Sequence, residues 1–149
     1  MKKWHDTNNE YTDDELLYCL TNIKNGIMFI SGPTMCGKTA MLKRLQSKFE
    51  FEMNIITEEY LVNYILGSCS WSSVTQEEFY ENTSEIILGI EDIDFLAGKE
   101  ATQKEAGRVL NQLCDAGKKI IITGISLKRK IPFLIQMTRK NTVGFFVYM

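Results

Sequence analysis

The stretch that decides the fold runs from residue 27 to residue 39. It starts with apolar residues and continues into a glycine-rich turn, reading Ile27-Met28-Phe29-Ile30-Ser31-Gly32-Pro33-Thr34-Met35-Cys36-Gly37-Lys38-Thr39. The apolar run is typical of a strand that is buried on both faces. The turn fits the pattern Gly-x-x-x-x-Gly-Lys-Ser/Thr at every fixed position, which predicts a phosphate-binding P-loop between a buried strand and a helix.

Each fixed residue of this loop has a chemical task in nucleotide binding. Main-chain N–H groups of a glycine-rich turn can point at phosphate oxygens, and the positive N-terminus of the following helix adds to this attraction. Lys38 is predicted to reach the β- and γ-phosphates, and the Thr39 hydroxyl to ligate Mg²⁺. The candidate nucleotide-binding residues are Gly32, Pro33, Thr34, Met35, Cys36, Gly37, Lys38, Thr39 and Ala40. The alternative interpretation is a glycine turn that binds nothing.

A second apolar run, residues 86–90, is followed directly by Glu91 and Asp92. If this strand neighbours the strand before the P-loop, the two acids lie beside the P-loop. One acid would then hold Mg²⁺ and the other would polarise an attacking water. From these residues alone, either acid could take either role. An acidic turn between a strand and a helix is the alternative interpretation.

Predicted strands and helices alternate over the rest of the chain. Capping-box spacing at residues 12–15 and 73–76 predicts two helix starts, and Gly26 is expected to end the first helix. The strands are predicted at 27–30, 53–56, 85–90, 120–123 and 143–148. Helices are predicted from 13, from 38 to 48, after Thr57, after 76, from 101 to 116 and from Pro132. This order predicts an α/β fold, with a mostly parallel five-stranded sheet and helices on both faces.

The composition is that of one ordinary globular domain. The chain has 149 residues, of which 44% are hydrophobic and 24% are charged, and this excludes a wholly disordered chain. No apolar run reaches the roughly 18 residues that a bilayer needs, and no apolar stretch follows the N-terminal lysines. We therefore expect no membrane contact and a cytoplasmic location. The four cysteines form no CxxC pair and His5 is the single histidine, so reduced thiols are expected rather than a structural zinc site.

Charge is distributed unevenly along the chain. Residues 1–100 carry 8 Lys and Arg against 17 Asp and Glu, a net charge of −9, whereas residues 101–149 carry 9 against 2, a net charge of +7. Such asymmetry is typical of a nucleic-acid surface or of a head-to-tail contact between copies. Two solvated faces without a partner would give the same pattern.

Residues 91–105, EDIDFLAGKEATQKE, resemble a stretch of the DnaA family of bacterial chromosomal replication initiators, which are AAA+ ATPases. Members of that family typically read Asp-Asp-Ile-Gln-Phe-Leu-Ala-Gly-Lys-Glu after their second acidic motif. Residues 55–60 and 119–132 resemble, in the same order, the family's Ser-Glu-Glu-Phe segment and its first sensor. The resemblance covers residues 25–149. It implies a P-loop NTPase of the AAA+ type, a three-layer sandwich with ATP at an edge that faces a neighbouring subunit.

The resemblance also implies a domain division and several departures from the family. Residues 1–24 would be an N-terminal helical lead-in and residues 25–149 the AAA+ core, with the family's lid and helix-turn-helix domain expected to be absent. Glu91 stands where the family has its Mg²⁺-binding aspartate, and Asp92 stands where the family has its water-activating acid. The resemblance thus assigns Glu91, together with Thr39, to the metal and Asp92 to the water. Ile125 stands where the family has its sensor aspartate, for which Thr123 or Ser126 could substitute. Arg139 or Lys140 matches the arginine finger, unless these cations simply cap a helix end. The candidate catalytic residues are therefore Asp92, Lys38, Thr123 and Arg139.

The resemblance implies an accessory or regulator of replication initiation that binds ATP or ADP with Mg²⁺ and hydrolyses ATP weakly or with assistance. Its partners would be AAA+ subunits, either the full-length initiator or further copies of the chain. Residues 61–90 contain four acids and no Lys or Arg, which does not support a contact with single-stranded DNA. The basic residues 128–130, expected in a loop, could contact DNA phosphates or an acidic subunit face, or could be solvated. The rival functions are a self-sufficient small P-loop ATPase or kinase and a degraded initiator remnant without activity.

Overall fold

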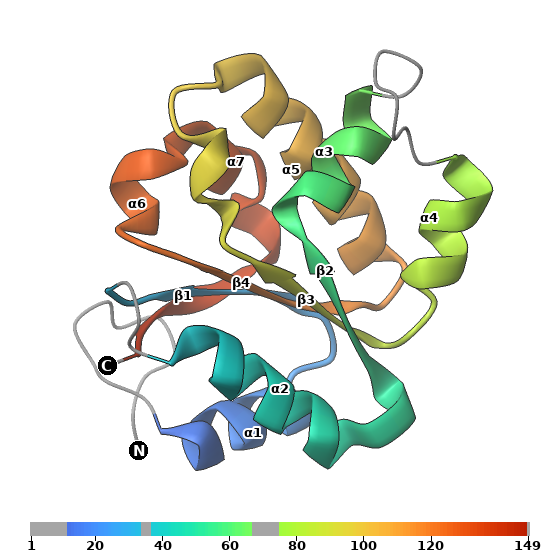
Figure 1. The fold of residues 1–149 in the computed structure, drawn as a ribbon, viewed down its shortest axis with the longest axis vertical. Coiled ribbons are helices and arrows are strands. Elements are labelled where there is room, and N and C mark those ends of the chain that lie inside the picture. Colours follow the sequence, from blue (N-terminus) through green and yellow to red (C-terminus); the bar gives the residue numbers. More distant parts are fainter. Residues whose placement is uncertain (1–11, 34–36, 67–74, 149) are drawn as a thin grey trace.

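The computed structural model describes residues 12–33, 37–66 and 75–148. At its centre lies a five-stranded sheet with the strand order β2-β3-β4-β1-β5 (Figure 1). Every strand pairing in the sheet is parallel, so the predicted α/β sheet is confirmed. The strands are β1 Gly26–Ser31, β2 Met53–Thr57, β3 Ile87–Glu91, β4 Lys119–Gly124 and β5 Thr142–Val147.

Helices cover both faces of this sheet (Figure 1). They are α1 Asp13–Asn22, α2 Lys38–Phe49, α3 Glu58–Leu66, α4 Gln76–Asn82, α5 Glu100–Asp115, α6 Leu127–Lys130 and α7 Pro132–Met137. Short 3-10 turns join them at η1 Glu50–Glu52, η3 Ile93–Leu96 and η4 Arg139–Asn141. Helices α1 and α2 lie below the sheet in Figure 1, while α3, α5, α6 and α7 lie above it.

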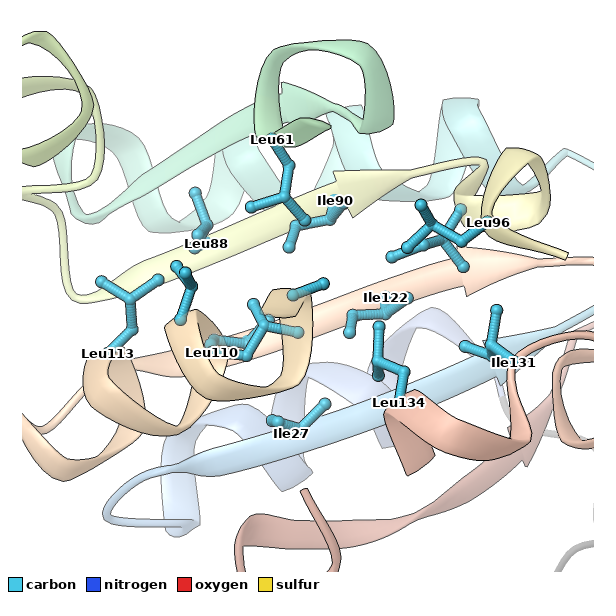
Figure 2. Close-up of a cluster of buried hydrophobic side chains, with 14 of the residues drawn as sticks. Ile27, Leu61, Leu88, Ile90, Leu96, Leu110, Leu113, Ile122, Ile131 and Leu134 are labelled. Atoms are coloured by element: carbon cyan, nitrogen blue, oxygen red, sulfur yellow. The ribbon is translucent and has the colours of Figure 1, made fainter. Parts of the chain in front are cut away.

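Alternation along β1 shows how the sheet builds two cores. Ile27 and Phe29 belong to the cluster on one face, whereas Met28 and Ile30 belong to the cluster on the other. Successive side chains of a strand point to opposite faces, so a strand that is apolar throughout needs cover on both. Figure 2 shows the first cluster, in which Leu110 of α5 and Leu134 of α7 pack toward the strands. The sheet thereby fixes the strand ends that carry the P-loop and the acids.

The local predictions are confirmed with some differences in detail. Thr12 caps α1 with a complete capping box, but α1 ends at Asn22 and Gly26 opens β1 with φ 134°. The second capping position is Thr75, which accepts a hydrogen bond from the Glu78 N–H. The basic residues 128–130 lie in α6 rather than in a loop. The division of the chain at residue 24 stays a prediction, although Leu16 of α1 packs in the same core cluster as α2.

Two cysteines of the described chain, Cys19 and Cys114, are free and buried. Burial raises the pKa of each thiol to about 12, so both are protonated and unreactive at neutral pH. Cys36 and Cys69 lie outside the described residues. Among the helices that the structure describes, none has both the length and the apolar character needed to cross a membrane.

Candidate nucleotide-binding site

The two ends of the P-loop are fixed by the sheet and by α2. Gly32 is buried, and its N–H donates to the Gly124 carbonyl of β4 at 3.1 Å. Gly37 adopts the left-handed conformation, with φ 98°, at the N-cap of α2. This conformation costs less free energy for glycine than for a residue with a Cβ, which explains why the motif has glycine at this position. The predicted binding residues Thr34, Met35 and Cys36 lie outside the described residues.

The Lys38 side chain binds the main chain at the start of the loop. Its side chain is buried, and Nζ donates to the carbonyls of Gly32 at 2.6 Å and Pro33 at 2.9 Å. A buried ammonium needs hydrogen-bond partners, and these carbonyls supply them. The charge is therefore held between the end of β1 and the start of α2, where the motif predicts phosphate contacts.

A hollow of about 580 Å³ opens at this point. It is lined by Gly37, Lys38, Thr39, Ala40, Lys43, Asp92 and Ile125. Among the described residues, the lining holds two ammonium groups, one hydroxyl, one carboxylate and the N-terminus of α2. This volume lies within the range of small-molecule sites, and the donor set suits a phosphate chain.

The acidic strand reaches this hollow although it does not neighbour the P-loop strand. Strand β4 lies between β3 and β1. The acidic strand and the P-loop strand are therefore not neighbours, and the expectation that they had to be neighbours for the acids to reach the P-loop was wrong. Because all three strands are parallel, their carboxyl ends still meet at one edge of the sheet, and Asp92 lines the hollow. Glu91 is half-buried and is not among the lining residues.

Thr123 holds the turn that carries Asp92. The Asp92 backbone is left-handed, with φ 52°, and its N–H donates to the Thr123 hydroxyl oxygen at 3.2 Å. A non-glycine residue in this conformation costs about 1–2 kcal/mol, and the hydrogen bond offsets part of that cost. Thr123 itself is buried in β4. Its position therefore fixes the direction of the Asp92 main chain.

The acidic pair fits a site for Mg²⁺ that is completed by phosphate oxygens. Burial, followed by the charge of Asp92, raises the pKa of Glu91, and Lys43 partly opposes this effect. A cation at this place would favour the charged carboxylate. Within the described residues, no three His, Cys, Asp or Glu side chains gather to hold a metal by themselves. Mg²⁺ is commonly held by one or two carboxylates together with substrate phosphates, and Thr39, Glu91 and Asp92 match that donor set.

A third acid, Asp94, supports the rim of the hollow and was missed from the sequence. Its Oδ1 accepts a hydrogen bond from the Ile125 N–H at 2.8 Å and lies 3.5 Å from the Lys130 ammonium. A Cβ on Gly124 would lie 3.1 Å from the same oxygen and 2.4 Å from Leu127 Cδ2, so glycine permits this close approach. The sequence did offer one sign of its role, because Asp94 follows Glu91 by three residues.

Gln103 was also missed, and it joins several segments behind the site. The side chain is fully buried, and Nε2 donates to the carbonyls of Leu96 at 2.7 Å and Lys130 at 3.3 Å. Its Oε1 accepts from the N–H groups of Phe133 at 3.0 Å and Leu134 at 3.3 Å. The Gln103 amide thus accepts hydrogen bonds from two N–H groups at the start of α7 and links this helix to η3 and α6.

Arg139 does not join the hollow of its own chain. It lies in η4, directly before β5, and Thr142 at the start of β5 pairs with Ile27 at the start of β1. The P-loop follows the opposite end of β1. Arg139 is exposed, whereas Lys140 lies 3.6 Å from Asp115. The exposed Ser126 is absent from the lining of the hollow as well.

Comparisons with known proteins agree with this geometry. Residues 20–141 match the model of the bacterial DnaA ATPase domain. The chromosomal replication initiator protein DnaA of Kosmotoga olearia is 36% identical over 100 residues, which cover 63% of this chain and 22% of that protein. DnaA of Levilactobacillus brevis is 31% identical over 113 residues, covering 72% and 25%. The chain thus spans about a quarter of the length of these relatives.

Solved structures show the same fold. Domain III of the Thermotoga maritima replication initiation protein DnaA has a TM-score of 0.67 and 24% identity, with 92% of this chain and 62% of that chain covered. A replication initiator DnaA bound to AMPPCP and single-stranded DNA has a TM-score of 0.66 and 23% identity, with 92% and 44% covered. The sequence match and the AAA+ architecture lead to one conclusion: this chain belongs to the bacterial DnaA ATPase-domain family.

Proposed function

We propose that this chain binds ATP or ADP with Mg²⁺ in the P-loop hollow and serves as an accessory or regulator of replication initiation. One observation carries the proposal: Asp92 lines the same hollow as Lys38 and Thr39, although it follows a distant strand. Membership of the DnaA ATPase-domain family supports it. So does the similarity of the fold to a DnaA that binds AMPPCP. A role in replication initiation would place the chain in the cytoplasm.

Each residue would act at a stated place. The Lys38 ammonium would exchange its two loop carbonyls for phosphate oxygens, while the N–H groups at the start of α2 bind further oxygens. The Thr39 hydroxyl, with Glu91, would hold Mg²⁺, which when bound supplies charge neutralisation. Asp92 would also orient the attacking water. Thr123 would act as a positioning residue, because it binds the Asp92 main chain.

Two features support weak or assisted hydrolysis. Ile125 lines the hollow where the DnaA resemblance places the sensor aspartate, so that carboxylate is missing. Arg139 is remote from the hollow of its own chain, so its guanidinium would serve a second AAA+ subunit. The arrangement therefore favours an active site that is completed between subunits, either two copies of this chain or this chain and the full-length initiator.

Calorimetric titration of the full chain with MgATP and MgADP tests the site. Lys38→Ala is expected to abolish binding, because it removes a cation that lines the hollow. Asp92→Ala is expected to leave affinity within a few-fold and to remove any hydrolysis. Lys24→Ala, an exposed lysine outside the hollow, is the matched control and should bind normally. Equal losses of affinity in the Lys38 and Asp92 variants would contradict these roles.

The same measurements separate the rival functions. Absence of binding at about 1 mM nucleotide, a generous ceiling for a nucleotide enzyme, would support an inactive remnant. Rapid turnover by the isolated chain would support a self-sufficient ATPase or kinase. Sedimentation of the chain with the full-length initiator, with and without MgATP, tests the subunit contact. A complex that forms only with nucleotide, and that Arg139→Ala weakens, is expected.

A further inference from the structure

A second hollow, the β5 hollow, lies beside the edge strand β5 and has a different chemistry. It measures about 560 Å³ and is lined by Lys128, Pro132, Ile135, Gln136, Arg139, Thr142 and Phe145. The described part of its lining holds two cations, an amide, a hydroxyl and three apolar side chains, but no acid. A ligand for this hollow therefore has to bring its own negative charge along with an apolar group.

Three cations around the β5 hollow have no carboxylate partner among the residues that the structure describes. Two acids of the surrounding elements are already engaged, Asp94 with Lys130 and Asp115 with Lys140. Over the described residues, no carboxylate lies within ion-pair distance of Lys128, Arg129 or Arg139. Lys128 instead lies over the Phe145 ring, with Nζ 4.6 Å from its centroid. The positive charge at this place is thus available to an external anion.

Within residues 12–33, 37–66 and 75–148, one backbone edge of strand β5 has no pairing strand. In the part of the chain that the structure describes, β5 pairs with β1 alone. Its sequence, TVGFFV, has no charged residue and no proline, and these are the usual features that block strand addition. An open edge of this kind binds extended peptides through main-chain hydrogen bonds, with side-chain pockets giving specificity. Thr142 and Phe145 belong to both the edge strand and the hollow.

The geometry points to a docking site for an extended, acidic segment of another protein, which adds to the β5 edge and inserts one apolar side chain into the β5 hollow. Charge complementarity selects this occupant. A second copy pairing edge to edge would bring its own Lys128 and Arg139 against these cations. Single-stranded DNA would need an aromatic face for stacking, and Lys128 covers the Phe145 ring. Peptide docking goes beyond the proposed nucleotide binding and does not depend on it; only its effect on subunit contacts, described next, rests on the proposed function.

Occupancy of this site would affect Arg139. The peptide acids would lie against a guanidinium that the proposed function assigns to a neighbouring subunit. An acidic partner on β5 would thus compete with subunit contacts made through the same residue. This would link partner binding to assembly without any change at the P-loop.

Fluorescence anisotropy with a labelled peptide, Asp-Leu-Asp-Phe-Glu-Leu-Asp, tests the inference on the full chain without nucleotide. Lys128→Glu is expected to weaken binding about tenfold, because one attraction becomes a repulsion. Gln136→Glu, a second exposed position of the lining, should weaken it as well. Lys24→Glu is the matched control and should bind like the wild type. Circular dichroism of each variant establishes that the fold is retained.

Three changes of the probe complete the test. A peptide with lysines in place of the acids should not bind. N-methylation of alternate peptide bonds should abolish binding in one register and spare it in the other, since only one register faces the β5 edge. Equal affinity of wild type and Lys128→Glu would overturn the inference. Tighter binding of an oligo-dT strand at the same residues, or edge-to-edge dimers in sedimentation, would also overturn it.

Discussion

The two hollows of this chain use cations in different ways. The P-loop hollow takes Lys38, Thr39 and the start of α2 from one short motif and opposes them with Asp92. The β5 hollow takes its cations from α6 and η4 and sets them beside apolar side chains, with no acid among its described lining residues. A hollow that holds cations and an acid suits a phosphate group with a bound metal ion. A hollow that holds cations and apolar side chains suits an acidic peptide. The balance of charge within each hollow, rather than the cations alone, sets the ligand class.

The largest expected effect is a loss of stability from a change at Gln103, whose amide joins segments next to both hollows. Gln103→Leu should lower the free energy of unfolding by about 3 kcal/mol, because it leaves buried N–H and carbonyl groups at η3, α6 and α7 without partners. Urea unfolding measures this loss. Gln112→Leu, an exposed glutamine on the same helix, is the control and should change stability by about 0.5 kcal/mol at most. A loss in Gln103→Leu no larger than in the control would show that these bonds matter little.

A smaller effect is expected from a change in α5 that should affect ligand binding at the β5 hollow but not at the P-loop hollow. A Cβ on Gly107 of α5 would lie 2.7 Å from Met137 Cβ, and this atom moves only if α7 moves. Gly107→Ala should therefore cost about 1–2 kcal/mol, although alanine favours a helix. Because α7 forms a wall of the β5 hollow, peptide affinity should fall while nucleotide affinity stays the same.

Urea unfolding and the two binding assays check this prediction. Ala101→Ser, at an exposed position of α5, provides the matched control. Parallel losses of peptide and nucleotide affinity in Gly107→Ala would mean that the two hollows are not structurally independent.

The smallest effect concerns the P-loop side alone and depends on pH. Hydrogen bonds from Arg44 and Tyr148 lower the pKa of Asp13. The Tyr148 N–H in turn donates to the Ser31 carbonyl at 2.9 Å, directly before the P-loop. Since the folded pKa lies below the unfolded one, the Asp13 carboxylate stabilises the fold above about pH 4 and loses this effect as pH falls through the folded pKa.

Asp13→Asn should therefore lower the melting temperature at pH 6, and the difference from the wild type should shrink toward pH 2. Melting curves recorded over this range check the sign. Asp14→Asn changes a neighbouring exposed acid with no hydrogen bond to Arg44 among the described contacts, and should show no such trend. A difference that grows in acid would contradict the assignment.

Local features were predictable because they depend on short segments. The P-loop between β1 and α2, the capping box at Thr12 and the acids at the end of β3 follow from residues that are close in sequence. The start of α7 at Pro132 and the glycine after α5 belong to the same group. Helix α6 was missed, because a four-residue basic helix has no apolar period to reveal it.

The amino-acid sequence by itself determined the strand–loop–helix unit, the presence of an acidic strand end and the alternation that makes a parallel sheet. Only the tertiary structure decided that β4 separates β3 from β1, that Thr123 holds Asp92, that Gln103 ties three segments together and that cations gather over Phe145. The reason is physical. The first group depends on local backbone preference and periodic burial, whereas the second depends on which distant segments pack together once the sheet has formed.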